Sequence, residues 1–117
     1  MDREDVLACL SALSQGTRLD TFRLLVRHEP DGLPAGEIAR QLDVPQNTMS
    51  THLAILTRAR LLRSERQSRS IVYRAELDRL RDVTVFLVKD CCDGRAEICQ
   101  PLLAELLPCC PPESAAR

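Results

Sequence analysis

Apolar residues recur with helical spacing in several short segments that glycines and prolines separate. The first segment predicts a helix from about Arg3 to Ser14, which ends before Gly16. Its apolar face holds Val6, Cys9, Leu10 and Leu13. The second segment predicts a helix that Ser14 or Thr17 caps. Its apolar face holds Leu19, Phe22, Leu25 and Val26.

Two further helical segments follow the turn signal Pro30–Gly32. The third helix begins with Pro34 in its first turn and ends near Asp43. The fourth ends near Ala59 and carries an apolar stripe of three residues: Met49, Leu53 and Leu56. Because only three or four residues join these two helices, they are typical of a helix-turn-helix.

A β-rich stretch comes after the fourth helix. Leu61 and Leu62 precede a polar tip from Arg63 to Arg69, and Ser70 to Tyr73 then predict a second strand, so we expect a hairpin with two short strands. A fifth helix begins at Glu76 and carries one apolar face: Leu80, Val83, Leu87 and Cys91.

The order of elements defines the expected fold class. Asp93 and Gly94 end the fifth helix, and residues 98–107 favour a short sixth helix. The chain is therefore expected to be mainly α with a small β-hairpin, an α+β winged helix-turn-helix. We expect one domain over residues 1–107, with a thiol site at about 91–99, and a flexible tail over 108–117.

Net charge becomes informative only when it is divided along the chain. The 117 residues carry a formal net charge of -1, which argues against a nonspecific polyanion binder. Residues 46–75, however, contain six arginines and a single acid, Glu65, for a net charge of +5 between two flanks of -3 each. The fourth helix and the hairpin thus form a basic segment between acidic ones.

This basic segment holds the candidate DNA-binding residues. Small amides and hydroxyls near a helix N-terminus can bond base edges and phosphates in the major groove. The candidates on the fourth helix are Gln46, Asn47, Thr48, Ser50, Thr51 and His52. The hairpin arginines, which can bind the DNA backbone, are Arg63, Arg66 and Arg69. The alternative is a solvated basic face beside polar residues that only cap a helix.

Six cysteines in so short a chain would suit a secreted disulfide scaffold. No apolar run reaches the roughly 18 residues of a membrane span, and the N-terminus is acidic rather than signal-like. We therefore expect a soluble, cytoplasmic protein with reduced thiols and no membrane partner. Cys9 lies on an apolar face and is expected in the core, whereas the other five cysteines occupy the last 27 residues.

Cys91, Cys92 and Cys99 are the predicted metalloid ligands. Thiolates prefer soft acceptors, and three thiolates without histidine suit a pyramidal As(III) or Sb(III) centre better than tetrahedral zinc. Gly94 would let the chain fold back so that Cys99 approaches the adjacent pair. Cys109 and Cys110, in the tail, are auxiliary ligands, scavengers of metalloid, or without a role.

Three stretches resemble the ArsR/SmtB family of metal- and metalloid-responsive repressors. They are the recognition motif Leu42–Leu56, the opening Leu10–Leu19 and the wing Arg66–Tyr73, within a similarity over about residues 4–90. The resemblance implies a homodimer through the first and fifth helices that represses an operon until an inducer binds. For His52, at the family's Ser-x-His-Leu histidine, it implies packing or a phosphate bond. Pro45 departs from the family, which usually has serine at this cap.

The resemblance also bears on the inducer. The fifth helix has no histidine for a zinc-type site, and residues 36–40 lack the Cys-x-Cys pair of the enterobacterial arsenic sensors. Some arsenic regulators of the family instead place cysteines at the end of the fifth helix, which implies an As(III) site at Cys91, Cys92 and Cys99. Sb(III), methylated arsenicals and Cd(II) or Pb(II) stay open as inducers, and no organic cofactor is expected.

Two other functions stay open beside an As(III)-responsive repressor of double-stranded operator DNA. One is a repressor of the same fold that senses thiol oxidation or persulfidation, with a disulfide between a pair such as Cys92 and Cys99. The other is a metallochaperone or thiol-based binding module with no DNA partner. A thiol redox enzyme such as an arsenate reductase is disfavoured because no Gly-rich oxyanion loop accompanies the cysteines, so we expect no enzymatic activity.

Overall fold

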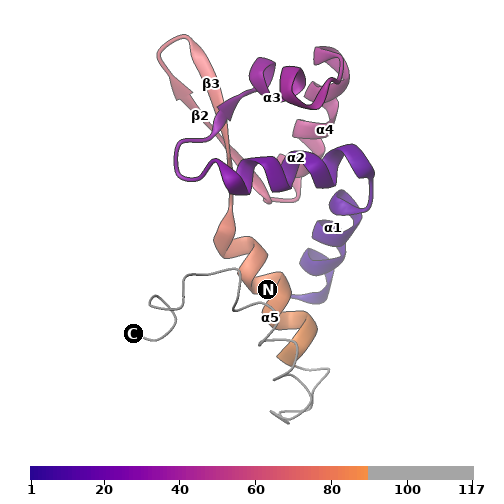
Figure 1. The fold of residues 1–117 in the computed structure, drawn as a ribbon. Coiled ribbons are helices and arrows are strands. Elements are labelled where there is room, and N and C mark those ends of the chain that lie inside the picture. The colour runs from indigo at the N-terminus through magenta and orange to yellow at the C-terminus, as the bar shows by residue number, and fades with distance from the viewer. Residues whose placement is uncertain (90–117) are drawn as a thin grey trace. The chain divides into compact units, whose positions relative to one another are not determined.

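The computed structural model of the protein describes residues 1–89, and Figure 1 shows the arrangement of their helices and strands. The elements are, in order, α1 (Arg3–Leu13), α2 (Gly16–Arg27), β1 (Leu33–Pro34), α3 (Ala35–Leu42), α4 (Gln46–Arg58), β2 (Leu62–Gln67), β3 (Ser70–Ala75) and α5 (Leu77–Lys89). Met1–Val83 form one compact unit, and the rest of α5 belongs to a second. The predicted sixth helix, the tail and its boundary at residue 108 lie outside the described residues.

The first four helices begin and end close to the predicted positions and α5 begins close to its own, while the predicted end of the fifth helix at Asp93 and Gly94 lies outside the described residues. The cap of α2 was predicted wrongly. Gln15, rather than Ser14 or Thr17, is the N-cap, and its side-chain oxygen accepts a hydrogen bond from the backbone N–H of Arg18 at 2.9 Å. Ser14 instead ends α1, where its hydroxyl donates to the carbonyl of Ser11 at 2.8 Å. Thr17 already lies inside α2. Only two residues separate the two helices here, so Ser14 ends α1 and Gln15 begins α2.

A third strand, β1, was missed by the sequence analysis. Leu33 pairs with Tyr73 and Pro34 with Val72, which gives an antiparallel sheet in the order β1-β3-β2. Pro34 is therefore the extended N-cap residue of α3, with φ -69° and ψ 155°, and not a residue of its first turn as predicted. A two-residue strand is too short to show the alternation by which strands are recognised.

The hairpin is longer than predicted. Strands β2 and β3 pair over six residues each, from Leu62 opposite Ala75 to Gln67 opposite Ser70. The polar segment from residue 63 onward is thus mostly strand, and the connection consists of Ser68 and Arg69. Only Leu62 of β2 is buried, because this edge strand is largely solvated. Backbone pairing with β3 holds β2 in place. Because its side chains are mostly polar, the sequence shows no alternation of apolar residues that would predict the full length of this strand.

The core confirms the apolar stripe of α4, since Met49, Leu53 and Leu56 are fully buried. Cys9 is also fully buried, which confirms its predicted place in the core. Three leucines of the predicted apolar faces are exposed in the single chain: Leu10 at 38%, Leu19 at 42% and Leu87 at 43%. The buried face of α1 consists of Val6, Cys9 and Ala12. It is turned away from Leu10, because Cys9 packs against the end of α4 at Ala59.

Membrane insertion finds no support in this part of the protein. None of the helices within residues 1–89 combines the length and the apolar character that crossing a bilayer requires.

A substitution at Gly32 tests the junction between the α2–β1 turn and the sheet. Gly32 has φ +73°, and an added Cβ would lie 2.5 Å from the carbonyl oxygen of Tyr73. We expect Gly32→Ala to lower the free energy of unfolding by about 2–4 kcal/mol, because left-handed backbone strain and overpacking act together. Chemical denaturation monitored by circular dichroism measures this change.

Gly16→Ala is the matched control. Gly16 is the first residue of α2, and apart from its two chain neighbours and the backbone of its own helix no atom lies within 4 Å of the place that an alanine Cβ would occupy there. We expect this variant to keep or slightly raise the free energy of unfolding, since alanine restricts the unfolded chain. Equal stability of the two variants would contradict the strained turn at Gly32.

Candidate nucleic-acid interface

Helices α3 and α4 are joined by a turn of three residues, which confirms the predicted helix-turn-helix. Asp43 adopts a left-handed conformation with φ 56°, and the N–H of Val44 donates to the carbonyl of Ala39 at 3.0 Å. Aspartate is among the few residues that tolerate this backbone region. The chain therefore changes direction sharply between α3 and α4.

The N-terminus of α4 has no side-chain cap. Pro45 occupies the N-cap position and makes no side-chain hydrogen bond, while its carbonyl accepts from the N–H of Met49 at 2.9 Å. The side-chain oxygen of Asn47 instead accepts from the N–H of Thr48 at 2.9 Å. The other free N–H groups of this first turn, with the positive end of the helix dipole, are available to an anion.

The polar residues predicted on α4 are exposed with one exception. Those open to solvent are Gln46, Asn47, Thr48, Ser50 and Thr51. Two of them bond their own helix, because the hydroxyl of Ser50 donates to the Gln46 carbonyl at 3.0 Å and that of Thr51 to the Asn47 carbonyl at 3.5 Å. Each hydroxyl oxygen keeps lone pairs for an outside donor.

His52 is the exception, since it is only partly exposed and faces α2. Its Nδ1 lies 3.4 Å from Nη1 of Arg18. Arginine only donates hydrogen bonds, so Arg18 is the donor side of this contact. Arg18 also donates through Nε to the carbonyl of Ala12 at 2.7 Å. His52 is thus part of a contact that joins α4 to α2 and to the end of α1.

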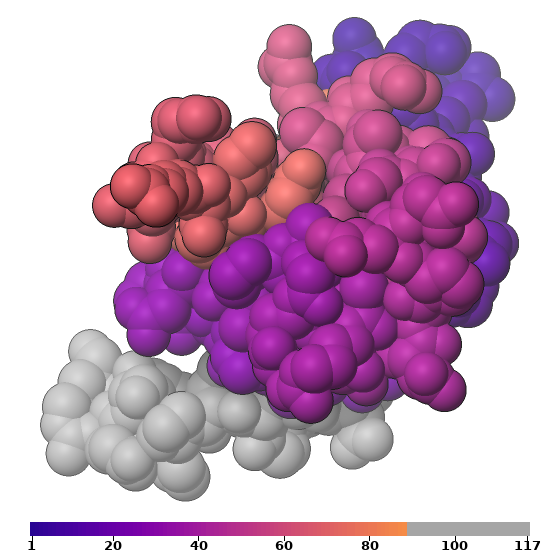
Figure 2. Space-filling view, turned by 90° about the horizontal axis from the view of Figure 1, so that it is seen from above, coloured from indigo at the N-terminus to yellow at the C-terminus, as the bar shows by residue number. Residues whose placement is uncertain are grey.

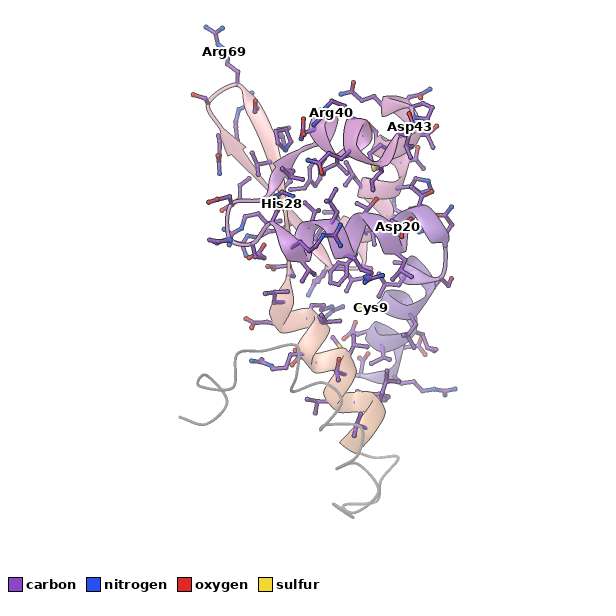
Figure 3. All side chains as sticks on the ribbon, in the orientation of Figure 1. Cys9, Asp20, His28, Arg40, Asp43 and Arg69 are labelled. Carbon is purple, nitrogen blue, oxygen red and sulfur yellow. The ribbon has the colours of Figure 1, made fainter. Side chains whose placement is uncertain are left out.

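The hairpin arginines fall into two groups. Arg66 and Arg69 are exposed, and no ion pair of either is found within residues 1–89. Figure 3 shows Arg69 projecting from the tip of the hairpin. Arg63 lies at the base instead, where its Nη1 is 2.7 Å from Oε1 of Glu76. The structure therefore separates Arg63 from the two tip arginines with which it was predicted to act.

Arg74 belongs to the basic segment but has a role the sequence analysis missed. Its guanidinium bonds Oε1 of Glu29 at 3.3 Å and Oε1 of Glu65 at 3.2 Å. The hydrogen bonds that Arg74 donates to Glu29 and then to Glu65 raise the pKa of Arg74. Arg74 thus ties β3 to β2 and to the turn after α2. Glu29 is 45 residues away from Arg74 in sequence, so no local sequence pattern could predict this ion pair.

On α3, Arg40 pairs with Glu37, which also accepts a hydrogen bond from Gln41 at 2.9 Å. The hydrogen bond from Arg40, and next that from Gln41, lower the pKa of Glu37 to about 2. A carboxyl with a lowered pKa contributes its stability above its ordinary value and loses it as the pH falls through about 2. Glu37 is therefore ionised at neutral pH and offsets the charge of Arg40 beside α4.

Figure 2 looks onto the end of the molecule at which α3, α4 and the hairpin lie. The exposed amides and hydroxyls lie in the N-terminal half of α4, and the two exposed arginines lie at the tip of the β2–β3 hairpin. We call these seven residues the reading surface: Gln46, Asn47, Thr48, Ser50, Thr51, Arg66 and Arg69.

The predicted metalloid ligands are not among the described residues. Cys91, Cys92, Cys99, Cys109 and Cys110 all lie beyond residue 89. Within residues 1–89 no three histidine, cysteine or acidic side chains are grouped so that they could hold a metal ion. Cys9, the thiol in this range, donates to the carbonyl of Ala59 at 3.5 Å. The described part of the chain thus contains the candidate interface but not the candidate sensor.

Comparisons with known proteins match this architecture. Residues 13–65 match a family described as "Helix-turn-helix domain". The HTH-type transcriptional regulator KmtR from Mycobacterium tuberculosis is 31% identical over 80 residues, which are 68% of this chain and 59% of that protein. The chain therefore spans less than two thirds of the length of this relative.

Solved structures extend the likeness to the whole described fold. An ArsR-like transcriptional regulator from a Rhodococcus species has a TM-score of 0.66 and 27% identity, covering 83% of this chain and 92% of that one. A homodimeric winged helix-turn-helix DNA-binding domain from Mycobacterium bovis has a TM-score of 0.61 and 23% identity, over 77% and 82% of the two chains. These similarities confirm the predicted fold class.

Proposed function

Because the chain is similar to ArsR-family and other helix-turn-helix transcriptional regulators, we propose that it belongs to this family and is a repressor that binds operator DNA as a homodimer. The observation that carries this proposal is the reading surface. It consists of exposed amides and hydroxyls at the start of α4 and of two arginines at the hairpin tip that have no ion pair within residues 1–89. The family of its relatives also supports the expectation that the chain is not an enzyme.

The start of α4 supplies the base contacts in this proposal. The N-terminal part of a recognition helix enters the major groove of DNA. There Gln46 or Asn47 can pair with adenine through two hydrogen bonds, and Ser50 or Thr51 can bond a base or a phosphate. His52, turned toward Arg18 at 3.4 Å, acts as a packing residue in this proposal.

In this proposal the tip arginines bind DNA phosphates and so add affinity without distinguishing one DNA sequence from another. The salt dependence of binding measures this contribution. Each phosphate contact contributes about 0.9 to the slope of log K against log salt. We expect the double variant Arg66→Ala, Arg69→Ala to reduce that slope by about 2 and to weaken binding to all sequences equally. Fluorescence anisotropy between low and moderate salt gives both quantities.

Arg23→Ala is the control for this loss of charge. Arg23 is exposed on α2 and lines a hollow with Leu19 and Leu80 rather than with residues of the hairpin, so its removal should leave the salt slope unchanged. A double variant with an unaltered slope would show that the hairpin tip does not contact DNA.

Exposed apolar side chains support a dimer through α1 and α5. Leu7 and Leu10 are exposed on α1, and Leu77, Val85 and Leu87 on α5. Each of the two helices thus leaves large apolar side chains exposed in the single chain, and such side chains favour an interaction site. A two-fold dimer would present two α4 helices to half-sites about 34 Å apart on successive turns of DNA.

As(III) is the inducer we propose, with Sb(III) as the next candidate. The chemistry of the donor set supports this choice, since Cys91, Cys92 and Cys99 offer three soft thiolates and no histidine lies near them in sequence. These residues would hold the metalloid, and its binding would lower the affinity of the dimer for operator DNA. Cys109 and Cys110 stay as auxiliary ligands in this proposal.

The test uses the full chain and the DNA upstream of its own gene. Anisotropy at moderate salt should show binding to this fragment and much weaker binding to a scrambled one, and arsenite added with reductant should release the DNA. Release by peroxide or polysulfide, but not by arsenite, would favour a thiol redox sensor. Equal affinity for the promoter and the scrambled fragment would favour a metallochaperone or thiol-binding module.

A further inference from the structure

The C-terminal end of α4 is held by side chains from two other helices. The carbonyl of Ala59, the C-cap residue of α4, accepts a hydrogen bond from Nε of Arg79 at 3.3 Å and another from Sγ of Cys9 at 3.5 Å. Ala59 is itself buried. A carbonyl at the end of a helix has no partner within that helix, so these two donors supply what the helix cannot.

Of the two donors, Arg79 has a further partner besides the Ala59 carbonyl. It lies in the first turn of α5, and its side chain is 17% exposed. Besides the Ala59 carbonyl, its guanidinium reaches Asp5 of α1, with Nη2 at 3.7 Å from Oδ1. A cation at the C-terminus of a helix also interacts favourably with the helix dipole. One side chain on α5 therefore joins the end of α4 to α1.

These contacts link the candidate reading helix to the helices of the proposed dimer. We infer that Arg79 is a positioning residue for operator binding, which fixes the angle of α4 against α1 and the start of α5. The inference rests on the proposed function. It adds a residue that does not touch DNA yet determines how well two copies of α4 match two half-sites.

The length of α4 explains why an anchor at one end matters at the other. A helix of 13 residues is about 20 Å long. A tilt of about 5° at its C-terminus then moves the N-terminal residues by roughly 2 Å. Hydrogen bonds to bases weaken steeply over such a displacement, whereas contacts of flexible arginines with phosphates tolerate it. Loss of the anchor should therefore reduce specific binding more than nonspecific binding.

The experiment compares Arg79→Met with Arg81→Met in the full chain. Arg81 lies on the same helix but is 67% exposed and pairs with Asp78 and Asp82 of α5 itself. For Arg79→Met we expect operator Kd to rise on the order of tenfold, with Kd for scrambled DNA unchanged. For Arg81→Met we expect wild-type values of both. Circular dichroism fixes a temperature at which every variant is fully folded.

Two further variants keep the test decisive if Arg79→Met fails to fold. Asp5→Asn removes the charged partner on α1 and leaves Arg79 in place, so we expect a smaller loss confined to operator DNA. Arg79→Lys keeps the positive charge and a donor, and should recover part of the operator affinity. Unchanged operator Kd in Asp5→Asn, or in a folded Arg79→Met, would overturn the inference, and so would a parallel loss on scrambled DNA.

The wild-type measurement separates this inference from the proposed function. If wild-type protein does not distinguish its promoter from scrambled DNA, the proposed function itself is contradicted. If it does, and the Arg79 variants keep the same ratio of the two affinities, only the positioning role is wrong.

Discussion

Serine at positions 91, 92 and 99 is expected to abolish the release of operator DNA by arsenite and to leave operator affinity at its wild-type value. A hydroxyl remains protonated at neutral pH and is a hard ligand, so Cys91→Ser, Cys92→Ser and Cys99→Ser together remove the soft donors that As(III) requires. The reading surface lies wholly within residues 46–69, apart from these positions in sequence. An arsenite titration of the preformed protein–operator complex measures the effect.

Other cysteines provide the controls for this experiment. Cys9→Ala removes a buried thiol and should leave release by arsenite intact. Cys109→Ser with Cys110→Ser should shift the arsenite midpoint if the tail supplies auxiliary ligands. For bound arsenite to weaken operator binding tenfold, the coupling free energy between the arsenite site and the DNA site must be about 1.4 kcal/mol. Arsenite that still releases DNA from the triple serine variant would show that the metalloid site is elsewhere.

A charge on the exposed face of α1 is expected to dissociate the dimer and, with it, operator binding. Leu7 is 47% exposed in the single chain, so Leu7→Glu should preserve the fold. In a two-fold interface each substitution appears twice. At about 2 kcal/mol for each copy, the two substitutions would raise the dimer Kd roughly 1000-fold. Sedimentation velocity measures the dimer, and anisotropy measures the loss of operator affinity.

Leu19→Glu is the matched control for Leu7→Glu. Leu19 is a leucine of similar exposure, 42%, on α2 rather than α1. We expect this variant to remain dimeric and to bind operator DNA. Dissociation by Leu19→Glu but not by Leu7→Glu would place the interface on α2 and contradict the proposed use of α1.

Most helices of the fold could be predicted because each buries a face that is visible in sequence. The stripe of Met49, Leu53 and Leu56 is fully buried as expected, and the prolines and glycines mark the helix ends within a few residues. The strands were harder to predict. β1 has two residues and β2 is mostly polar, so their backbone pairing with β3 left no periodic pattern of apolar residues.

The candidate interface could be predicted only in part, because charge in sequence does not indicate how each charge is used. All three hairpin arginines looked equivalent, yet Arg63 is paired with Glu76 while Arg66 and Arg69 carry no ion pair in the described chain. Arg74 was counted in the same basic segment and instead holds Glu29 and Glu65. Such pairs depend on residues that are distant in sequence.

By itself the sequence determined the order of the helices, the helix-turn-helix, the basic segment between acidic flanks and the clustering of five cysteines near the C-terminus. These features depend on local spacing and composition, which a linear pattern contains. Only the tertiary structure decided which leucines of α1 and α2 are exposed, which arginines are paired with acids, and that Arg79 and Cys9 meet at the Ala59 carbonyl. Those outcomes depend on how helices rotate and pack against one another, and packing joins residues without regard to their distance along the chain.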